Sequence, residues 1–172
     1  MDAVNSALAI AAGELIGISI EEAAEGLTRS ELTGKRLKIT AGNGVKVVDD
    51  TYNACEDSVK SAIDTLTAIE GKRHVAILGD ILGLAERAEA GHRAVGRHAA
   101  QKKIDLLIAV GDDARYYAEG ASEIMDKNNI MFFSTKEEFI EAAEGIIKTG
   151  DIILVKASRG MKMEQIVNKI LG

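Results

Sequence analysis

The sequence predicts an α/β protein built on an open, doubly wound, mostly parallel sheet. From residue 36 onward, short apolar runs alternate with longer segments of helical periodicity, which is the order of elements in such sheets. The runs VAIL, LLIAV and IILV are apolar at every position, as expected for strands that are covered on both faces. With 172 residues, of which 47% are hydrophobic, the chain can bury a substantial core.

The amino-terminal segment has a different pattern. Its sequence AVNSALAIAAGELIGISIEEAAEGL predicts two helices that break at Gly17, and no strand. The apolar stretch from Ala3 to Ile18 lacks a basic start and is too short to cross a bilayer, so we expect a buried helix without a targeting role. Such a pair either covers one end of the sheet or is the remnant of a preceding domain, and we favour the remnant. The predicted division is 1–30 and 31–172.

Six strands and five further helices are predicted in the second part. The strands run from Arg36 to Thr40, Val45 to Asp49, His74 to Leu78, Asp105 to Val110, Ile130 to Phe133 and Ile152 to Val155. The helices lie near 57–70, 86–103, 114–127, 135–148 and 161–171. Gly-Asn-Gly at 42–44 predicts a hairpin, because no helix follows it to form a dinucleotide-binding loop.

Charge and cysteine content narrow the function classes. The net charge of −6, without a cluster of Lys or Arg, argues against a nucleic-acid partner. The single cysteine, Cys55, cannot form an internal disulfide, and no group of residues has metal-ligand spacing. We therefore expect small-molecule or protein partners and a reducing, cytoplasmic location.

Polar turns follow the predicted strands, and ligands of open α/β sheets bind beyond the carboxyl ends of strands. The turns are DDTYN at 49–53, GD at 79–80, GDD at 111–113, ST at 134–135 and KASRG at 156–160. Helix capping is the preferred interpretation of Asp113 and of Ser134 or Thr135. For Asp80, a structural role and a ligand-binding role stay equally open.

The first of these turns carries two acids and a tyrosine. Successive side chains of a strand point to opposite faces, so Asp49 and Asp50 cannot both face one ligand atom. Asp50 could accept hydrogen bonds from a ribose, and Tyr52 could either stack on a base or lie in the core. No phosphate-binding loop, metal cluster or nucleophile with an adjacent base is present, so we expect the chain alone to lack the groups that catalysis requires.

Three long motifs resemble, in order and spacing, the C-terminal domain of the Mur ligases. They are VVDDTYNACEDSVKSAI, ILGDILGLAERAEAGHRAVG and LVKASRGMKMEQIVNKIL. The segment AVNSALAIAAGELIGIS likewise resembles the helix that ends the family's central ATPase domain. The resemblance implies a Rossmann-like C-terminal domain over 31–172, preceded by a helical remnant of the central domain over 1–30. The phosphate-binding loop would then lie upstream of Met1.

The resemblance also implies a reaction in peptidoglycan precursor synthesis. In this family ATP phosphorylates the carboxylate of a UDP-linked muramoyl peptide, and an incoming amine attacks the acyl phosphate. Here the peptide is expected to be the UDP-linked muramoyl tripeptide and the acceptor D-alanyl-D-alanine. ATP and Mg²⁺ are the implied cofactors, with the Mg²⁺ ligands in the upstream domain. This chain alone is therefore expected to be inactive.

The resemblance assigns residues to the nucleotide side by motif. Asn5 matches the family asparagine near the adenine, and Asp50 matches the acid on the ribose. Tyr52 and Asn53 fall in the nucleotide-side turn. Asp49 is then expected to hold the turn.

The acceptor side is assigned to the turn after the last strand, which contains Lys156, Ser158 and Arg159. Gly160 allows the turn, and the start of the next helix offers unpaired N–H groups that suit a carboxylate. Arg159 could grip that carboxylate through two hydrogen bonds, or could instead pair with Glu164 on the same surface.

Two departures from the family pattern affect the acceptor more than the fold. Cys55 and Glu56 stand where the family usually has Asn-Pro, and Gly83 and Ala85 stand where Glu and Gly are common. The alternatives are a related Mur-type ligase with another amino acid or dipeptide acceptor, or a free-standing nucleotide-binding regulatory domain.

Overall fold

The computed structural model of the chain describes residues 3–29 and 36–172. Backbone contacts divide the chain into two compact units, Met1–Gly34 and Lys35–Gly172. The boundary expected from the sequence, between residues 30 and 31, lies outside the described residues. No helix in the described ranges has the length and apolar character that a bilayer span requires.

The first unit consists of two helices, α1 (Ala3–Leu15) and α2 (Ile20–Thr28). Gly17 has a φ of 87°, a backbone conformation that favours glycine, and the predicted break at this residue is confirmed. Ser19 caps α2: its Oγ accepts the N–H of Glu22, whose carboxylate accepts the N–H of Ser19.

The prediction that the apolar amino-terminal helix is buried is wrong for this chain. Among the residues of this unit whose burial is described, only Gly13 is buried. Leu8 and Leu15 have exposed fractions of 63% and 89%. Helical periodicity identified the helix correctly, but it cannot tell what covers the helix.

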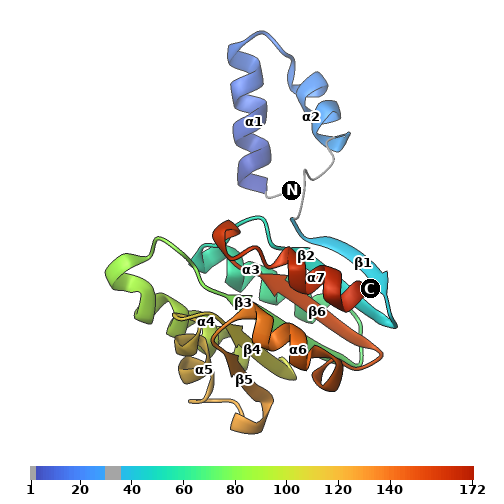
Figure 1. Cartoon of the computed structure of the whole chain (residues 1–172). Coiled ribbons are helices and arrows are strands. Elements are labelled where there is room, and N and C mark those ends of the chain that lie inside the picture. Colours follow the sequence, from blue (N-terminus) through green and yellow to red (C-terminus); the bar gives the residue numbers. More distant parts are fainter. Residues whose placement is uncertain (1–2, 30–35) are drawn as a thin grey trace. The chain divides into compact units, whose positions relative to one another are not determined.

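The second unit contains a six-stranded sheet in the order β1-β2-β6-β3-β4-β5 (Figure 1). Its strands are β1 (Lys38–Gly42), β2 (Val45–Asp50), β3 (Arg73–Gly79), β4 (Leu106–Val110), β5 (Ile130–Phe133) and β6 (Asp151–Lys156). The β1–β2 pair is antiparallel and all other pairs are parallel, so the predicted mostly parallel α/β fold and the hairpin at 42–44 are confirmed.

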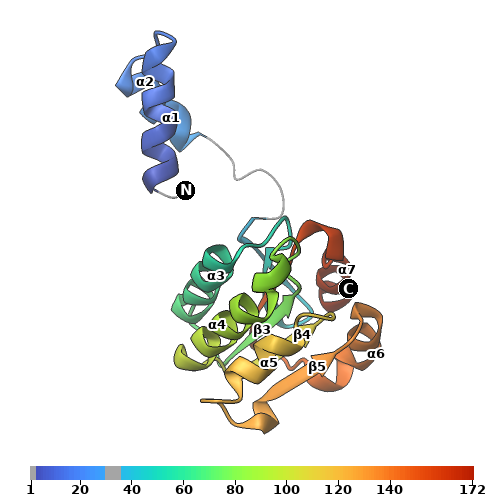
Figure 2. The same ribbon diagram turned by 90° about the vertical axis from the view of Figure 1, so that its left-hand side faces the viewer.

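Five α-helices pack on the two faces of the sheet. They are α3 (Glu56–Ala68), α4 (Ala88–Gln101), α5 (Arg115–Ala121), α6 (Lys136–Ile146) and α7 (Glu164–Leu171). Figure 2 shows α3, α4 and α5 on one face and α6 and α7 on the other. The last helix begins later than expected, because Arg159–Met161 forms a 3₁₀ turn and Lys162 has a φ of 52°.

The strands bury both of their faces. Along β6, Ile152 and Leu154 belong to the core under α3, α4 and α5, whereas Ile153 and Val155 belong to the core under α6 and α7. This two-sided burial explains why the strands are apolar at nearly every position. Because both faces of the sheet are covered, ligands can bind only at the polar turns that follow the strands.

Candidate functional site

Most of the predicted site residues lie at the carboxyl ends of β2 and β6, which are neighbouring strands. β6 is flanked by β2 and β3, and its last residue, Lys156, is in register with Asp50 of β2 and Leu78 of β3. The turns that follow these three strands therefore meet at the carboxyl edge of the sheet. We call this edge, formed by turns 49–53, 79–82 and 156–160, the rim.

Asp49 and Asp50 point to different partners, as the alternation of a strand predicts. Oδ1 of Asp49 accepts the N–H and the hydroxyl of Thr51, at 3.1 and 2.6 Å, which confirms that Asp49 holds the turn. Asp50 contacts Nζ of Lys156 through Oδ2, at 2.5 Å, and the N–H of Leu37 through Oδ1, at 3.3 Å. A carboxylate offers about four lone-pair sites, so Asp50 keeps acceptor capacity for a ligand.

Lys156 is nearly inaccessible, with 3% of its side chain exposed. Its ammonium group donates to the carboxylate of Asp50 and to the carbonyl oxygen of Asn53, the latter at 2.9 Å. Both partners belong to the turn after β2. Lys156, which the family motif places on the acceptor side, is therefore bonded to the turn that the motif assigns to the nucleotide.

Tyr52 is 38% exposed, so the core interpretation of this residue is wrong. The guanidinium carbon of Arg36 lies 4.4 Å from the centre of its ring, and that of Arg159 lies 5.2 Å from the centre. These distances are typical of cation–π contacts. Arg36 is not among the site residues that the sequence predicts, because only the chain reversal in the β1–β2 hairpin brings the start of β1 beside the end of β2.

Ser158 links the turn after β6 to the turn after β3. Its N–H donates to the carbonyl oxygen of Asp80 at 3.0 Å, and its Oγ accepts the N–H of Leu82 at 2.8 Å. The residue is buried, and its hydroxyl proton is still available for donation. Among the three residues expected on the acceptor side, Arg159 is the exposed one.

Asp80 has a structural contact in the rim. Its Oδ1 accepts the N–H of Ala114 at 2.7 Å. Burial raises the pKa of Asp80, and this backbone hydrogen bond counteracts part of the rise. The predicted capping role of Asp113 is wrong, since the N-cap of α5 is Ala114, without a side-chain cap. Thr135 caps α6 as predicted.

A buried histidine, His92, supports the same turn. Nε2 of His92 accepts the N–H of Ile81 at 3.0 Å, so its Nδ1 carries the proton and donates to the carbonyl oxygen of Ala88. The neighbouring Tyr117 hydroxyl donates to the carbonyl oxygen of Gly79, and burial raises the pKa of this tyrosine well above 10.0. Its contacts within the protein give His92 a structural role.

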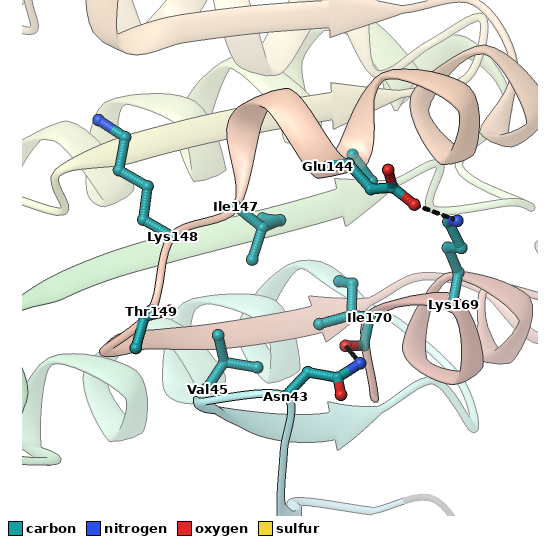
Figure 3. Close-up of a pocket in the computed structure, with 9 residues that line it drawn as sticks. Asn43, Val45, Glu144, Ile147, Lys148, Thr149, Lys169 and Ile170 are labelled. Atoms are coloured by element: carbon teal, nitrogen blue, oxygen red, sulfur yellow. Dashed lines mark hydrogen bonds and ion pairs between the residues drawn. The ribbon is translucent and has the colours of Figure 1, made fainter. Parts of the chain in front are cut away.

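Two hollows lie at the opposite, amino-terminal edge of the parallel strands. The first, of about 200 Å³, is lined by residues that include Asn43, Val45 and Lys148 (Figure 3). The second, of about 470 Å³, is lined by residues that include Arg73 and Asp105. Neither hollow is lined by a predicted site residue. The candidate site is therefore the rim, at the carboxyl ends of the strands.

Asn5, the remaining predicted site residue, is exposed on α1 in the amino-terminal unit and stays a prediction. In the described part of the chain, no group of three or more His, Cys, Asp or Glu side chains is placed to hold a metal ion. The described residues therefore do not offer a carboxylate cluster that fits Mg²⁺.

Residues 35–159 match the family model described as "Mur ligase, glutamate ligase domain". The UDP-N-acetylmuramoyl-tripeptide–D-alanyl-D-alanine ligase of Bacillus subtilis is 36% identical over 170 residues, covering 98% of this chain and 37% of that protein. The ligase of the same name from Haemophilus influenzae is 29% identical, over 95% of this chain and 35% of that protein.

The fold is also similar to a crystal structure of MurF from Acinetobacter baumannii. The TM-score is 0.83 at 28% sequence identity, and the match covers 97% of this chain and 37% of that one. The chain thus spans little more than a third of the length of the relatives that it matches.

Proposed function

Because this chain belongs to the Mur ligase family, we propose that it is the nucleotide- and acceptor-binding part of an ATP-dependent amide ligase. The proposed reaction joins D-alanyl-D-alanine to a UDP-N-acetylmuramoyl tripeptide in peptidoglycan precursor synthesis. The names of the Bacillus subtilis and Haemophilus influenzae relatives, which match nearly the whole chain, support these substrates. ATP and a nucleotide-linked peptide as substrates favour a cytoplasmic location.

The observation that carries the proposal is the junction of two turns at the rim. Asp50, Tyr52 and Asn53 lie in one turn, and the turn with Lys156 and Arg159 lies beside it on the neighbouring strand. Attack of an amine on an acyl phosphate requires both reactants to be held close together. Adjacent nucleotide and acceptor turns suit this requirement.

On the nucleotide side, we propose that Asp50 accepts hydrogen bonds from the ribose through its remaining lone pairs. Tyr52, exposed and flanked by Arg36, is proposed to border the nucleotide together with Asn53. Asn5 is proposed to lie near the adenine, as the family motif implies.

On the acceptor side, we propose that Arg159 binds the terminal carboxylate of D-alanyl-D-alanine. Arg159 is exposed, and its guanidinium group has the planar fork that matches a carboxylate. Ser158 can donate its hydroxyl proton toward the same turn, because its oxygen already accepts the N–H of Leu82.

The phosphate-binding loop and the Mg²⁺ ligands are proposed to belong to an upstream domain, of which residues 1–30 are the tail. Phosphoryl transfer depends on groups that position and neutralise the γ-phosphate. The described residues offer no metal-binding cluster, and the sequence contains no G-x-x-x-x-G-K-[ST] motif.

The test begins with the reading frame upstream of Met1. We expect it to encode a G-x-x-x-x-G-K-[ST] motif, and the polypeptide that includes it should ligate D-alanyl-D-alanine to the UDP-linked tripeptide with release of phosphate. The 172-residue chain alone should fold but neither hydrolyse ATP nor form the amide. Turnover by the chain alone, or an in-frame stop directly upstream, would refute the proposal.

A panel of acceptors separates this ligase from related ones. The longer polypeptide is assayed with D-alanyl-D-alanine, single amino acids and other dipeptides at equal concentration. Preference for a single amino acid or another dipeptide would show a related ligase with a different acceptor. Nucleotide binding without ligation of any of them would instead indicate a regulatory domain.

A further inference from the structure

On the basis of the function proposed above, we propose that Lys156 is a positioning residue for the nucleotide turn and does not contact the acceptor. Its ammonium group fixes both the carboxylate of Asp50 and the backbone carbonyl of Asn53. This assignment moves Lys156 from the acceptor side, where the motif placed it, to the support of the ribose-binding acid.

The sheet itself sets the contact between the two side chains. Asp50 and Lys156 are paired in the parallel register of β2 and β6, and each is the last residue of its strand. Side chains of paired residues point to the same face and lie close together. The resulting distance of 2.5 Å is therefore held by two packed strands and not by a loop.

Burial and bonding leave Lys156 unsuited to gripping a free dipeptide. Only 3% of its side chain is exposed, and at least two of its three N–H donors are directed at the nucleotide turn. Arg159 is exposed at the same turn and can present its charge to a carboxylate. The two cations of the turn thus have different tasks.

The ion pair also reduces the repulsion between a ribose-binding carboxylate and the phosphates of the nucleotide. An unpaired carboxylate near a triphosphate would repel it, because like charges a few ångströms apart interact strongly in a poorly solvated site. Lys156 offsets the charge of Asp50 while leaving lone pairs for the ribose hydroxyls. Without Lys156, Asp50 would be a buried carboxylate without its counter-charge, and its orientation would no longer be fixed.

A double-mutant cycle in the ligase-active longer polypeptide tests this assignment. The variants are Lys156→Met, Asp50→Asn and the double variant, and KM is measured separately for ATP and for D-alanyl-D-alanine. We expect Lys156→Met to raise the KM for ATP about tenfold and to leave that for the dipeptide within about twofold. The double variant should be no worse for ATP than the worse single variant, because both changes act on one contact.

Arg73→Lys is the matched control. Arg73 and Asp151 form a partly buried ion pair at the opposite end of β6. This substitution should lower the melting temperature without changing either KM.

Lys156→Arg is a second test of the assignment. It keeps the charge and should recover part of the affinity for ATP that Lys156→Met loses, which a general loss of packing would not predict.

Opposite results would overturn the assignment. A rise in the KM for the dipeptide with an unchanged KM for ATP would make Lys156 an acceptor-binding residue, and additive effects in the double variant would separate it from Asp50. If the unsubstituted polypeptide does not ligate, the proposed function fails instead. The same cycle, measured by urea unfolding of the 172-residue chain, then still decides whether the two side chains are coupled.

Discussion

Each end of β6 carries an ion pair with a neighbouring strand, buried at one end and partly buried at the other, but the pairs differ in how many of their polar atoms are bound. At the amino end, Arg73 donates through Nε and Nη2 to both carboxylate oxygens of Asp151, at 2.8 and 2.6 Å. The same carboxylate accepts the N–H of Lys148, and Arg73 also donates to the carbonyl oxygen of Ile146. Protein groups bind both carboxylate oxygens and two of the guanidinium nitrogens.

At the carboxyl end, the pair of Lys156 and Asp50 is joined at a single point. One oxygen of Asp50 meets the ammonium group and the other accepts a long bond from the N–H of Leu37. Burial and charge are therefore common to both ends, and they do not by themselves identify a binding site. The unused acceptor capacity, beside exposed Tyr52 and Arg159, distinguishes the rim.

The largest effect is expected when the ion pair of Arg73 and Asp151 is broken. Arg73→Met should lower the free energy of unfolding by about 3 kcal/mol, because it leaves Asp151 buried without its partner. The value is at the low end for buried pairs, since 23% of the Arg73 side chain is exposed to water. Urea unfolding of the 172-residue chain measures the change. A loss below about 1 kcal/mol would place this pair with ordinary surface ion pairs.

The next largest effect is expected on the use of ATP when Asp50 is changed. In the longer polypeptide, Asp50→Ala should raise the KM for ATP by the equivalent of about 1.5–3 kcal/mol, the contribution of hydrogen bonds to a charged acceptor. Asp49→Ala is the control, because its carboxylate is bonded to Thr51 and should mainly affect stability. If Asp49→Ala alone weakened ATP use, Asp50 would not be the ribose-binding acid.

A smaller effect is expected for the acceptor. Arg159→Lys retains the charge but loses the two-pronged donor, so the KM for D-alanyl-D-alanine should rise by the equivalent of about 1 kcal/mol. The KM for ATP should stay unchanged, although Arg159 lies over Tyr52. Steady-state kinetics with each substrate varied in turn separates the two. Unaltered kinetics for both substrates would leave Arg159 a surface residue.

Much of the fold could be predicted because its signals are local. Apolar runs between turn residues gave all six strands, and the turn residues Asn43 and Gly44, both with positive φ, gave the hairpin. Strand ends then indicated where the polar turns meet. The two-sided burial of β6 followed from its unbroken apolar sequence.

The turns that meet at the rim could be predicted from the sequence, but the contacts between them could not. Lys156 and Asp50 are 106 residues apart, and only the strand order brings them together. The sequence alone could not show that Asp80, and not Asp113, would bond to the N–H of Ala114 at the start of α5. Likewise, the apolar character of α1 does not reveal what would cover it.

The smallest effect, at Asp80, tests whether burial in the rim has an energetic cost. Burial raises the pKa of this carboxyl above its ordinary value of 3.8. The folded state therefore holds the proton more tightly than the unfolded state. This contribution to stability is complete below pH 3.8 and is lost as the pH rises through the folded-state pKa.

Asp80→Asn removes this titration but keeps an oxygen that can accept the N–H of Ala114. The free energy of unfolding of the original chain, relative to that of the variant, should therefore fall as the pH rises from below 3.8 toward neutrality. The change is expected to be small, because the bond from Ala114 offsets part of the cost of burial. Urea unfolding of both chains across this pH series measures it. A constant difference at every pH would show that water reaches Asp80 and that the rim stabilises its charged form as well as solvent does.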